Sequence, residues 1–230
     1  MLTADFFLPV SDELIEEAVS HFPNCLGNAT IFNSSSGFPE LPSSGIAILS
    51  IGDYRLSATD GAMDISKSFR QRLYRLHKHE HPITTVDLGA LRPGSTPDDT
   101  RFALSEIVRD LIVAGMMPVV IGGSQDLTLA LHEAYRPFGK LMNITSIDSR
   151  FDLGSPDSNL SSKAWLGKIV LQQPTYLFNF SNIGYQTYFN SQEEIDLVEK
   201  LFFDAYRLGD VSSAISIAEP VFRDADVVTF

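Results

Sequence analysis

The stretch of residues 117–154 constrains the fold most, because it holds two short apolar runs that each end in a burst of polar residues. The runs are residues 118–121 and 143–147, and a helical pattern lies between them. A strand, a tight polar loop, a helix and a second strand predict a parallel βαβ unit. Ligands of open α/β sheets bind outside the carboxyl ends of the strands, and both bursts lie at such ends.

The rest of the chain continues this alternation. Continuous apolar runs at residues 45–51 and 83–88 predict strands covered on both faces, and further strands are expected at 175–180 and 226–230. We expect helices after Ser11, at 63–79, from Pro97 to Gly115, after Asp126, and at 161–171, 191–205 and 211–218. The predicted fold is a three-layer α/β domain, with a mostly parallel sheet and helices on both faces.

The sequence also predicts two loops and the apolar positions of two helices. Residues 23–45 are rich in Pro, Gly, Ser and Asn and predict a loop, as does the polar and aromatic stretch 180–190. In the helices, Phe102 is one of the periodic apolar positions, and Phe202 occupies an apolar position that we expect to face inward.

The length of 230 residues is enough for one domain with a large core. Residues 226–230 have the pattern of a central strand, which a loop should follow. We therefore predict a single domain over residues 1–230 that is truncated at its C-terminal end.

Charge and composition exclude several classes of partner. The formal net charge of −12 disfavours binding to a nucleic-acid backbone. No run of about 18 apolar residues predicts a membrane span, and the N-terminus does not resemble a signal peptide. Cys25 is the only cysteine, which fits a reducing compartment and predicts a cytoplasmic protein. A catalytic role for Cys25 is the alternative, although no organised partner lies near it in the sequence.

Three histidines alternate at His77, His79 and His81. They could form a metal site if the segment were a strand, or they could close a helix before Pro82, where a histidine interacts favourably with the helix dipole. The helix end is the favoured interpretation.

The first burst comprises Gly122, Gly123, Ser124, Gln125 and Asp126. Two glycines let the backbone turn tightly and approach a ligand closely, which predicts a ligand loop. The alternative is that Ser124 or Asp126 simply caps the following helix. The burst lacks the Lys-Ser/Thr ending of a phosphate-binding loop.

The second burst contains Asp148, Arg150 and Asp152 at alternate positions. If the strand conformation continues, all three side chains share one face. Two carboxylates on one face suit a hard cation, but the guanidinium between them offers only donors and cannot ligate a metal. The residues therefore predict an ion-pair row of Asp148, Arg150 and Asp152.

Together the two bursts resemble the ureohydrolase family, which includes arginase, agmatinase and formimidoylglutamase. That family has one strand ending in GGDHS and another ending in DAHxD, and here PVVIGGSQDLT and SIDSRFDLG stand in the same contexts. A third family motif, SxDxDxxDP, follows a strand that DVVTF at the end of this chain resembles. The resemblance extends from about Gly45 onward, and LFNFSNIGYQTYF is most similar to the formimidoylglutamase-like branch.

The resemblance implies a pair of manganese ions that share a hydroxide, which attacks an amidine or guanidinium carbon. Transferred position by position, the first-motif histidine corresponds to Gln125 and the second-motif ligands to Asp148, Arg150 and Asp152. Of these positions, Asp148 and Asp152 retain a carboxylate, so the resemblance implies these two residues as metal ligands.

Two functional hypotheses follow. The first is a manganese-dependent hydrolase of linear amidine C–N bonds, whose substrate is a small acidic amino-acid derivative. The second is a non-catalytic relative in which Arg150 and its neighbours replace the metal cluster, so that the protein binds a ligand or serves in an assembly. The resemblance also implies a homo-oligomer.

Overall fold

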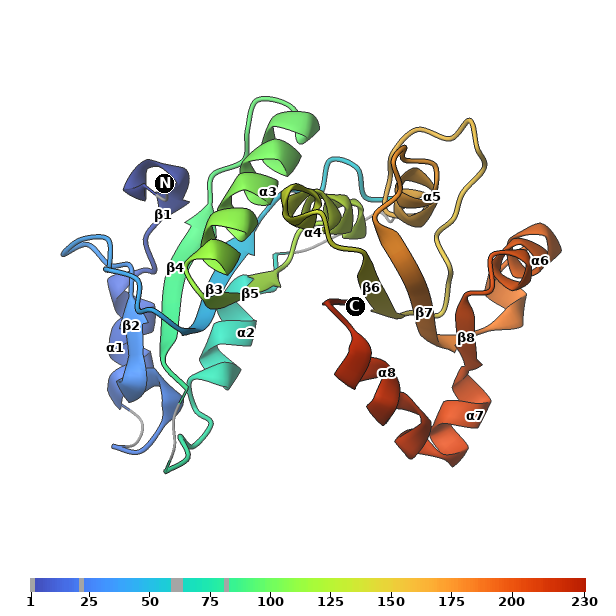
Figure 1. Ribbon diagram of the computed structural model, residues 1–230. Coiled ribbons are helices and arrows are strands. Elements are labelled where there is room, and N and C mark those ends of the chain that lie inside the picture. The colour runs from blue at the N-terminus through green and yellow to red at the C-terminus, as the bar shows by residue number, and fades with distance from the viewer. Residues whose placement is uncertain (1–2, 21–22, 59–63, 81–82) are drawn as a thin grey trace. The chain divides into compact units, whose positions relative to one another are not determined.

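The computed structural model describes residues 3–20, 23–58, 64–80 and 83–230. These residues form two compact units. Unit 1 consists of Met1–Arg55 and Gly61–Gly123, and unit 2 of Leu56–Asp60 and Ser124–Phe230. Each unit is built on its own β-sheet with helices packed against it (Figure 1).

The sheet of unit 1 is parallel except for one short strand. It runs in the order β1-β4-β3-β5, and β2 also pairs with β4. Strand β1 is antiparallel to β4, whereas β2 and β3 pair with β4 in parallel and β5 pairs with β3 in parallel. The strands are β1 (Phe7–Leu8), β2 (Thr30–Phe32), β3 (Gly45–Ile51), β4 (Thr85–Leu91) and β5 (Met116–Ile121).

The helices of unit 1 are α1 (Asp12–Ser20), α2 (Ser66–Leu73) and α3 (Pro97–Val113). The chain crosses from β3 to β4 in one direction and from β4 back past β3 to β5 in the other. Right-handed crossovers then place α2 and α3 on opposite faces of the sheet. Helix α3 begins with a capping box in which Thr96 and Asp99 satisfy each other's backbone N–H groups.

The sheet of unit 2 is entirely parallel and has the order β8-β7-β6-β9. The chain moves from β6 to β7 to β8 and then returns to the far side of β6 as β9. The strands are β6 (Met142–Ile147), β7 (Leu177–Tyr185), β8 (Asp204–Arg207) and β9 (Val227–Thr229).

The helices of unit 2 cover both faces of this sheet, in keeping with the reversal of chain direction. One core gathers Trp165, Phe151 and Phe180 with α4 and α5, and a smaller one joins Ile183 to Val211 and Ala218 of α7 and α8. The helices are α4 (Thr128–Tyr135), α5 (Trp165–Val170), α6 (Gln192–Lys200), α7 (Leu208–Ser213) and α8 (Ala218–Asp224). Short 3-10 helices occupy Ala4–Phe6, Leu26–Ala29, Gln125–Leu127, Arg136–Phe138, Thr187–Phe189 and Ile215–Ile217.

Several predicted boundaries are wrong. The loop predicted at residues 23–45 contains β2, and β7 continues to Tyr185 through part of the second predicted loop. The helix predicted at 191–205 ends at Lys200, and its last residues enter β8. The prediction that Phe202 faces inward is also wrong, because Phe202 follows the end of the helix and is 89% exposed. Phe102 is also exposed, on the outer side of α3.

The histidine run does not close a helix. Helix α2 ends at Leu73, and His77 instead forms an antiparallel bridge with the buried Cys25, while His81 lies outside the described residues. Sequence periodicity overestimated the length of α2, since its last apolar position, Leu76, is exposed.

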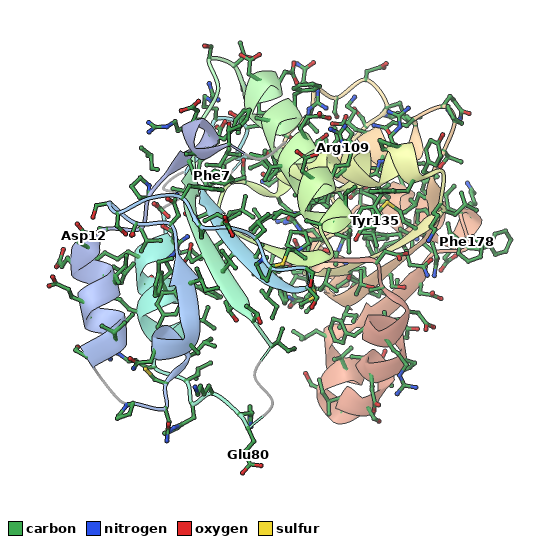
Figure 2. The ribbon with its side chains drawn as sticks, turned by 60° about the vertical axis from the view of Figure 1, so that its left-hand side comes forward. Phe7, Asp12, Glu80, Arg109, Tyr135 and Phe178 are labelled. Carbon is green, nitrogen blue, oxygen red and sulfur yellow. The ribbon has the colours of Figure 1, made fainter. Side chains whose placement is uncertain are left out.

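Figure 2 shows the side chains on both sheets, with Phe178 at the start of β7 pointing away from the ribbon. Within the described residues, we find no helix that combines the length and apolar character needed to cross a membrane.

Candidate functional site

The polar segment after β6 is held in place by two asparagines from a distant part of the chain. The Asn190 side chain accepts a hydrogen bond from the backbone N–H of Phe151 at 2.8 Å and donates to the carbonyl of Ser149 at 3.0 Å. From β7, the Asn182 side chain donates to the carbonyl of Arg150 at 2.8 Å. Sequence reasoning missed both asparagines because nothing local links them to this segment.

The predicted ion-pair row does not form in the part of the chain that the structure describes. The Arg150 guanidinium donates through Nη1 to the carbonyl oxygen of Phe189 at 2.7 Å and lies over its ring, with Cζ 4.9 Å from the centroid. Asp148 instead accepts from the backbone N–H of Arg150 at 3.0 Å, the bond of an Asx-turn. This turn ends the strand at Ile147, so the alternation of side chains does not continue.

Asp152 is the most buried acid of the segment, with 5% exposure. Its backbone is left-handed, with φ of 53°, and the indole Nε1 of Trp165 lies 3.4 Å from its carboxylate. Burial, with a further contribution from Asp148, raises the pKa of Asp152 to about 7. The carboxyl group is therefore only partly ionised at neutral pH.

A small pocket of about 100 Å³ opens beside this segment. Its lining combines two cationic side chains, two acidic ones, an aromatic ring and an amide. These are Arg150, Lys163, Asp152, Glu194, Phe189 and Asn190. All six belong to unit 2, so the pocket is complete within that unit.

The first burst is split between the units. Gly122 and Gly123 close unit 1 and have φ of 80° and 73°, the left-handed conformation that glycine adopts without strain. A side chain at Gly122 would meet the carbonyl oxygen of Ile51 at 2.9 Å, so the glycine permits the close approach of β3.

The remaining residues of this burst open unit 2. The buried Ser124 hydroxyl donates to the Asp126 carboxylate and makes no helix cap, because α4 begins only at Thr128. The predicted capping role of Ser124 or Asp126 for α4 is therefore wrong. Gln125 has a buried side-chain nitrogen, Nε2, without a hydrogen-bond partner in the described residues.

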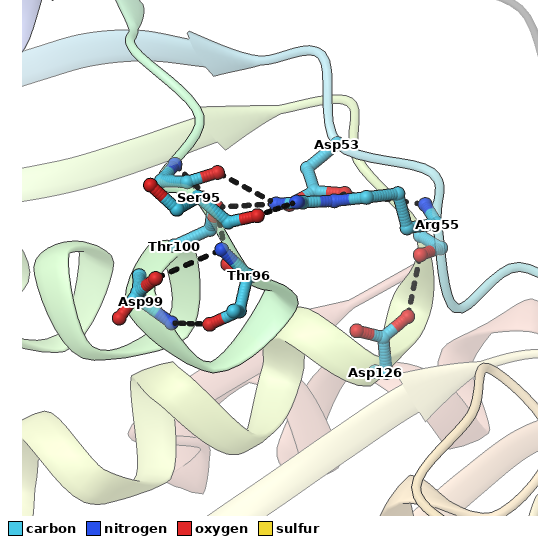
Figure 3. A network of polar contacts seen from close by, with 9 residues as sticks. Asp53, Arg55, Ser95, Thr96, Asp99, Thr100 and Asp126 are labelled. Carbon is cyan, nitrogen blue, oxygen red and sulfur yellow. Dashed lines mark hydrogen bonds and ion pairs between the residues drawn. The ribbon is translucent and has the colours of Figure 1, made fainter.

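A third polar cluster follows the carboxyl end of β3. Arg55 binds Asp53 through its Nε at 3.0 Å and reaches the carbonyls of Gly94 and Ser95 and the hydroxyl of Thr100 (Figure 3). The hydrogen bonds from Arg55 hold the pKa of Asp53 below its usual value. This network fastens β3 to the start of α3, a structural role, and its donors are consumed internally.

The family of the chain is decided by its match to a family model. The model of the arginase family matches residues 44–222. The chain belongs to the arginase family. It is 27% identical over 155 residues to a formimidoylglutamase of Hahella chejuensis, across 64% of this chain and 46% of that protein. The chain thus spans less than half the length of this relative.

Solved structures of arginase-family proteins show the same fold. A formiminoglutamase of Trypanosoma cruzi with Mn²⁺ matches 84% of this chain and 71% of its own, with a TM-score of 0.69 and 20% identity. The formimidoylglutamase of Bacillus subtilis matches 83% of this chain and 65% of its own, with a TM-score of 0.68 and 13% identity. An arginase from Medicago truncatula matches 77% and 60%, with a TM-score of 0.64 and 16% identity. The expected arginase-like α/β fold is confirmed.

The manganese pair that this family implies does not fit the side chains present. In the sequence, Arg150 takes the place of a ligand between Asp148 and Asp152, and a guanidinium has no lone pair to offer and repels a cation. Asp152 is buried against Trp165, and Asp148 is used by its own turn. Among the described residues, no three His, Cys, Asp or Glu side chains gather closely enough to hold a metal ion.

Proposed function

We propose that this chain is a formimidoylglutamase-like member of the arginase family that binds a small amino-acid-derived molecule in the Arg150 pocket without two-metal hydrolysis. The observation that carries the proposal is the placement of Arg150. Its guanidinium is fixed by the Phe189 carbonyl and ring at the wall of a pocket that Asp152 also lines.

Chemistry at the pocket supports binding more than hydrolysis. A hydrolase needs a group that activates water, and a permanently protonated guanidinium supplies none. Of the two acids in the lining, Asp152 faces Trp165 and Glu194 is engaged in the capping box of α6. It does supply directional donors for an anionic ligand. Asp148 and Asp152 then act as neighbours that orient the segment and limit the positive charge of the site.

Manganese-dependent hydrolysis of linear amidines is the second candidate, and the similarity to formimidoylglutamases favours it. In that case Asp148 and Asp152 would be metal ligands, with Gln125 as a neutral oxygen donor. Metal bound there would activate water for attack on the amidine carbon. Arg150 would then have to leave the coordination sphere.

The two candidate functions predict different amounts of manganese bound to the protein. We would measure manganese in the purified chain by elemental analysis, together with its thermal stability with and without added Mn²⁺. The binding proposal predicts no stoichiometric manganese and no rise in Tm, since a metal that binds only the folded state would stabilise it. Stoichiometric metal together with turnover of a linear amidine would overturn the proposal in favour of hydrolysis.

The variant Arg150→His makes this test sharper, with Arg223→His on the exposed surface of α8 as its matched control. We expect Arg150→His to gain manganese affinity over the control, because it exchanges a repelling cation for an imidazole ligand in a segment that also carries Asp148 and Asp152. No gain would mean that the backbone of the segment, and not only Arg150, prevents metal binding.

We also propose a cytoplasmic location and a homo-oligomeric state. The buried, lone Cys25 supports a reducing compartment, and family resemblance supports self-association. Size-exclusion chromatography with light scattering tests the second point.

A further inference from the structure

The pocket lining contains two cations that make no direct ion pair with the acidic side chains beside them. Within the described residues, neither Arg150 nor Lys163 forms an ion pair with a carboxylate, whereas Arg55 and Arg70 are each bound to an aspartate. A cation at a pocket wall without a protein counterion is a binding group for an anion.

The Arg150 guanidinium is fixed in advance of binding. One nitrogen, Nη1, donates to the Phe189 carbonyl at 2.7 Å, and Cζ lies over the Phe189 ring, 4.9 Å from its centroid. A guanidinium has five N–H donors, and Nε and Nη2 of Arg150 make no hydrogen bond to the residues that the structure describes, so they remain for a planar, bidentate acceptor. Because these contacts already restrict the side chain, an anion that binds there does not have to order it.

The volume and the remaining lining limit the size and shape of the ligand. About 100 Å³ holds several water-sized groups, which suits the head of a small molecule. Glu194 is already occupied by the capping box of α6, in which its carboxylate accepts from the N–H of Ser191 at 3.0 Å. The Asp152 carboxyl faces Trp165.

We propose that the pocket binds a small carboxylate, with Arg150 as the bidentate anion-binding group and Lys163 as a second cation at the more exposed side. The proposal rests on the proposed function, in that it takes the Arg150 pocket as the ligand site. It adds the charge class of the ligand and the residues that recognise it.

Trp165 provides a local signal for binding. It is the only tryptophan of the chain, is fully buried, and contacts Asp152 of the pocket lining. We would titrate the full chain with glutarate, a dicarboxylate, and with agmatine, a cation of similar length, while following Trp165 fluorescence and calorimetric heat.

Three variants remove one positive charge each: Arg150→Gln, Lys163→Gln and, as the control, Arg223→Gln. Arg223 is exposed on α8 of the same unit and pairs with Glu219 one helical turn away. Circular dichroism and thermal melting verify that each variant is folded.

The proposal predicts saturable glutarate binding that Arg150→Gln weakens by about tenfold or more, the size expected for loss of a charge-assisted pair of hydrogen bonds. Lys163→Gln should weaken binding by a few-fold, since an exposed point charge contributes less. Arg223→Gln should bind as the unmodified chain does. Added salt should weaken binding of the unmodified chain more than that of Arg150→Gln.

The possible failures are distinguishable. Agmatine binding without glutarate binding would overturn the carboxylate assignment and leave the pocket as the ligand site. Glutarate binding that Arg150→Gln does not change would overturn the role of Arg150. If neither probe gives heat or a Trp165 signal, the proposed ligand-binding function itself fails.

Discussion

The Arg70 guanidinium of α2 binds both carboxylate oxygens of Asp87 on β4, through Nε at 2.7 Å and Nη2 at 2.9 Å. Both side chains are buried, and Tyr74 donates its hydroxyl to the same carboxylate. Arg70 also donates to the hydroxyl of Ser50 on β3. A single ion pair therefore joins α2 to two neighbouring strands in the interior of unit 1.

Removing one partner of this pair should be costly. We expect Arg70→Met to lower the free energy of unfolding by about 3–5 kcal/mol, because it leaves the Asp87 charge buried without its counterion. Urea unfolding followed by circular dichroism measures this. The double variant Arg70→Met with Asp87→Leu should recover part of the loss, and a double variant less stable than the single one would contradict this explanation.

Asn190 should control the order of the segment after β6. The variant Asn190→Ala removes hydrogen bonds to Phe151, Ser149 and Gln186, so we expect a loss of roughly 2 kcal/mol and faster amide exchange at residues 149–151. Hydrogen exchange with mass spectrometry reports both. Asn179→Ala is the matched control, since Asn179 bonds to Asp204 on the surface. Equal exchange in the two variants would remove Asn190 from this role.

His132 should make unit 2 sensitive to acid. It is fully buried on α4, neither ring nitrogen has a partner in the described residues, and burial lowers its pKa to about 4. The unfolded chain, with an ordinary pKa near 6.5, then binds the proton more tightly than the folded chain. Stability present above pH 6.5 is lost as the pH falls toward 4, by up to roughly 3 kcal/mol.

The variant His132→Leu tests this directly. Its unfolding free energy should fall less between pH 7 and pH 4.5 than that of the unmodified chain, because the imidazole that must be protonated is gone. Other acids titrate in both proteins, so the difference between the two slopes isolates His132. Identical slopes would show that this imidazole does not contribute.

Phe202 occupies a position where glycine would be more stable. It follows the C-cap of α6 with φ of 58°, its N–H donates to the carbonyl of Glu199, and its side chain is 89% exposed. A left-handed residue after a helix favours glycine, so Phe202→Gly should raise the free energy of unfolding by about 1 kcal/mol. Thermal melting measures the change, with Phe178→Gly on β7 as the exposed control, which should not be stabilised. A lower Tm for Phe202→Gly would mean that the ring makes a stabilising contact.

Local signals allowed the sequence to determine the framework of the fold. The apolar run at residues 45–51 coincides with β3, and Pro97 begins α3 behind its capping box. These features need only neighbours a few residues away, and they were sufficient for the α/β class and the family resemblance. The placement of ligand-type residues after β5 and β6 followed from the same strands.

Only the tertiary structure decided what those residues contact. Asp148, Arg150 and Asp152 alternate in the sequence, yet Arg150 binds the carbonyl of Phe189, 39 residues away, and Asn190 holds the segment in its turn. A backbone carbonyl carries no signal in the side-chain pattern, and the end of β6 depends on an Asx-turn that competes with extension. Burial of Asp152 against Trp165 likewise comes from packing of α5 against the segment after β6, which no local pattern encodes.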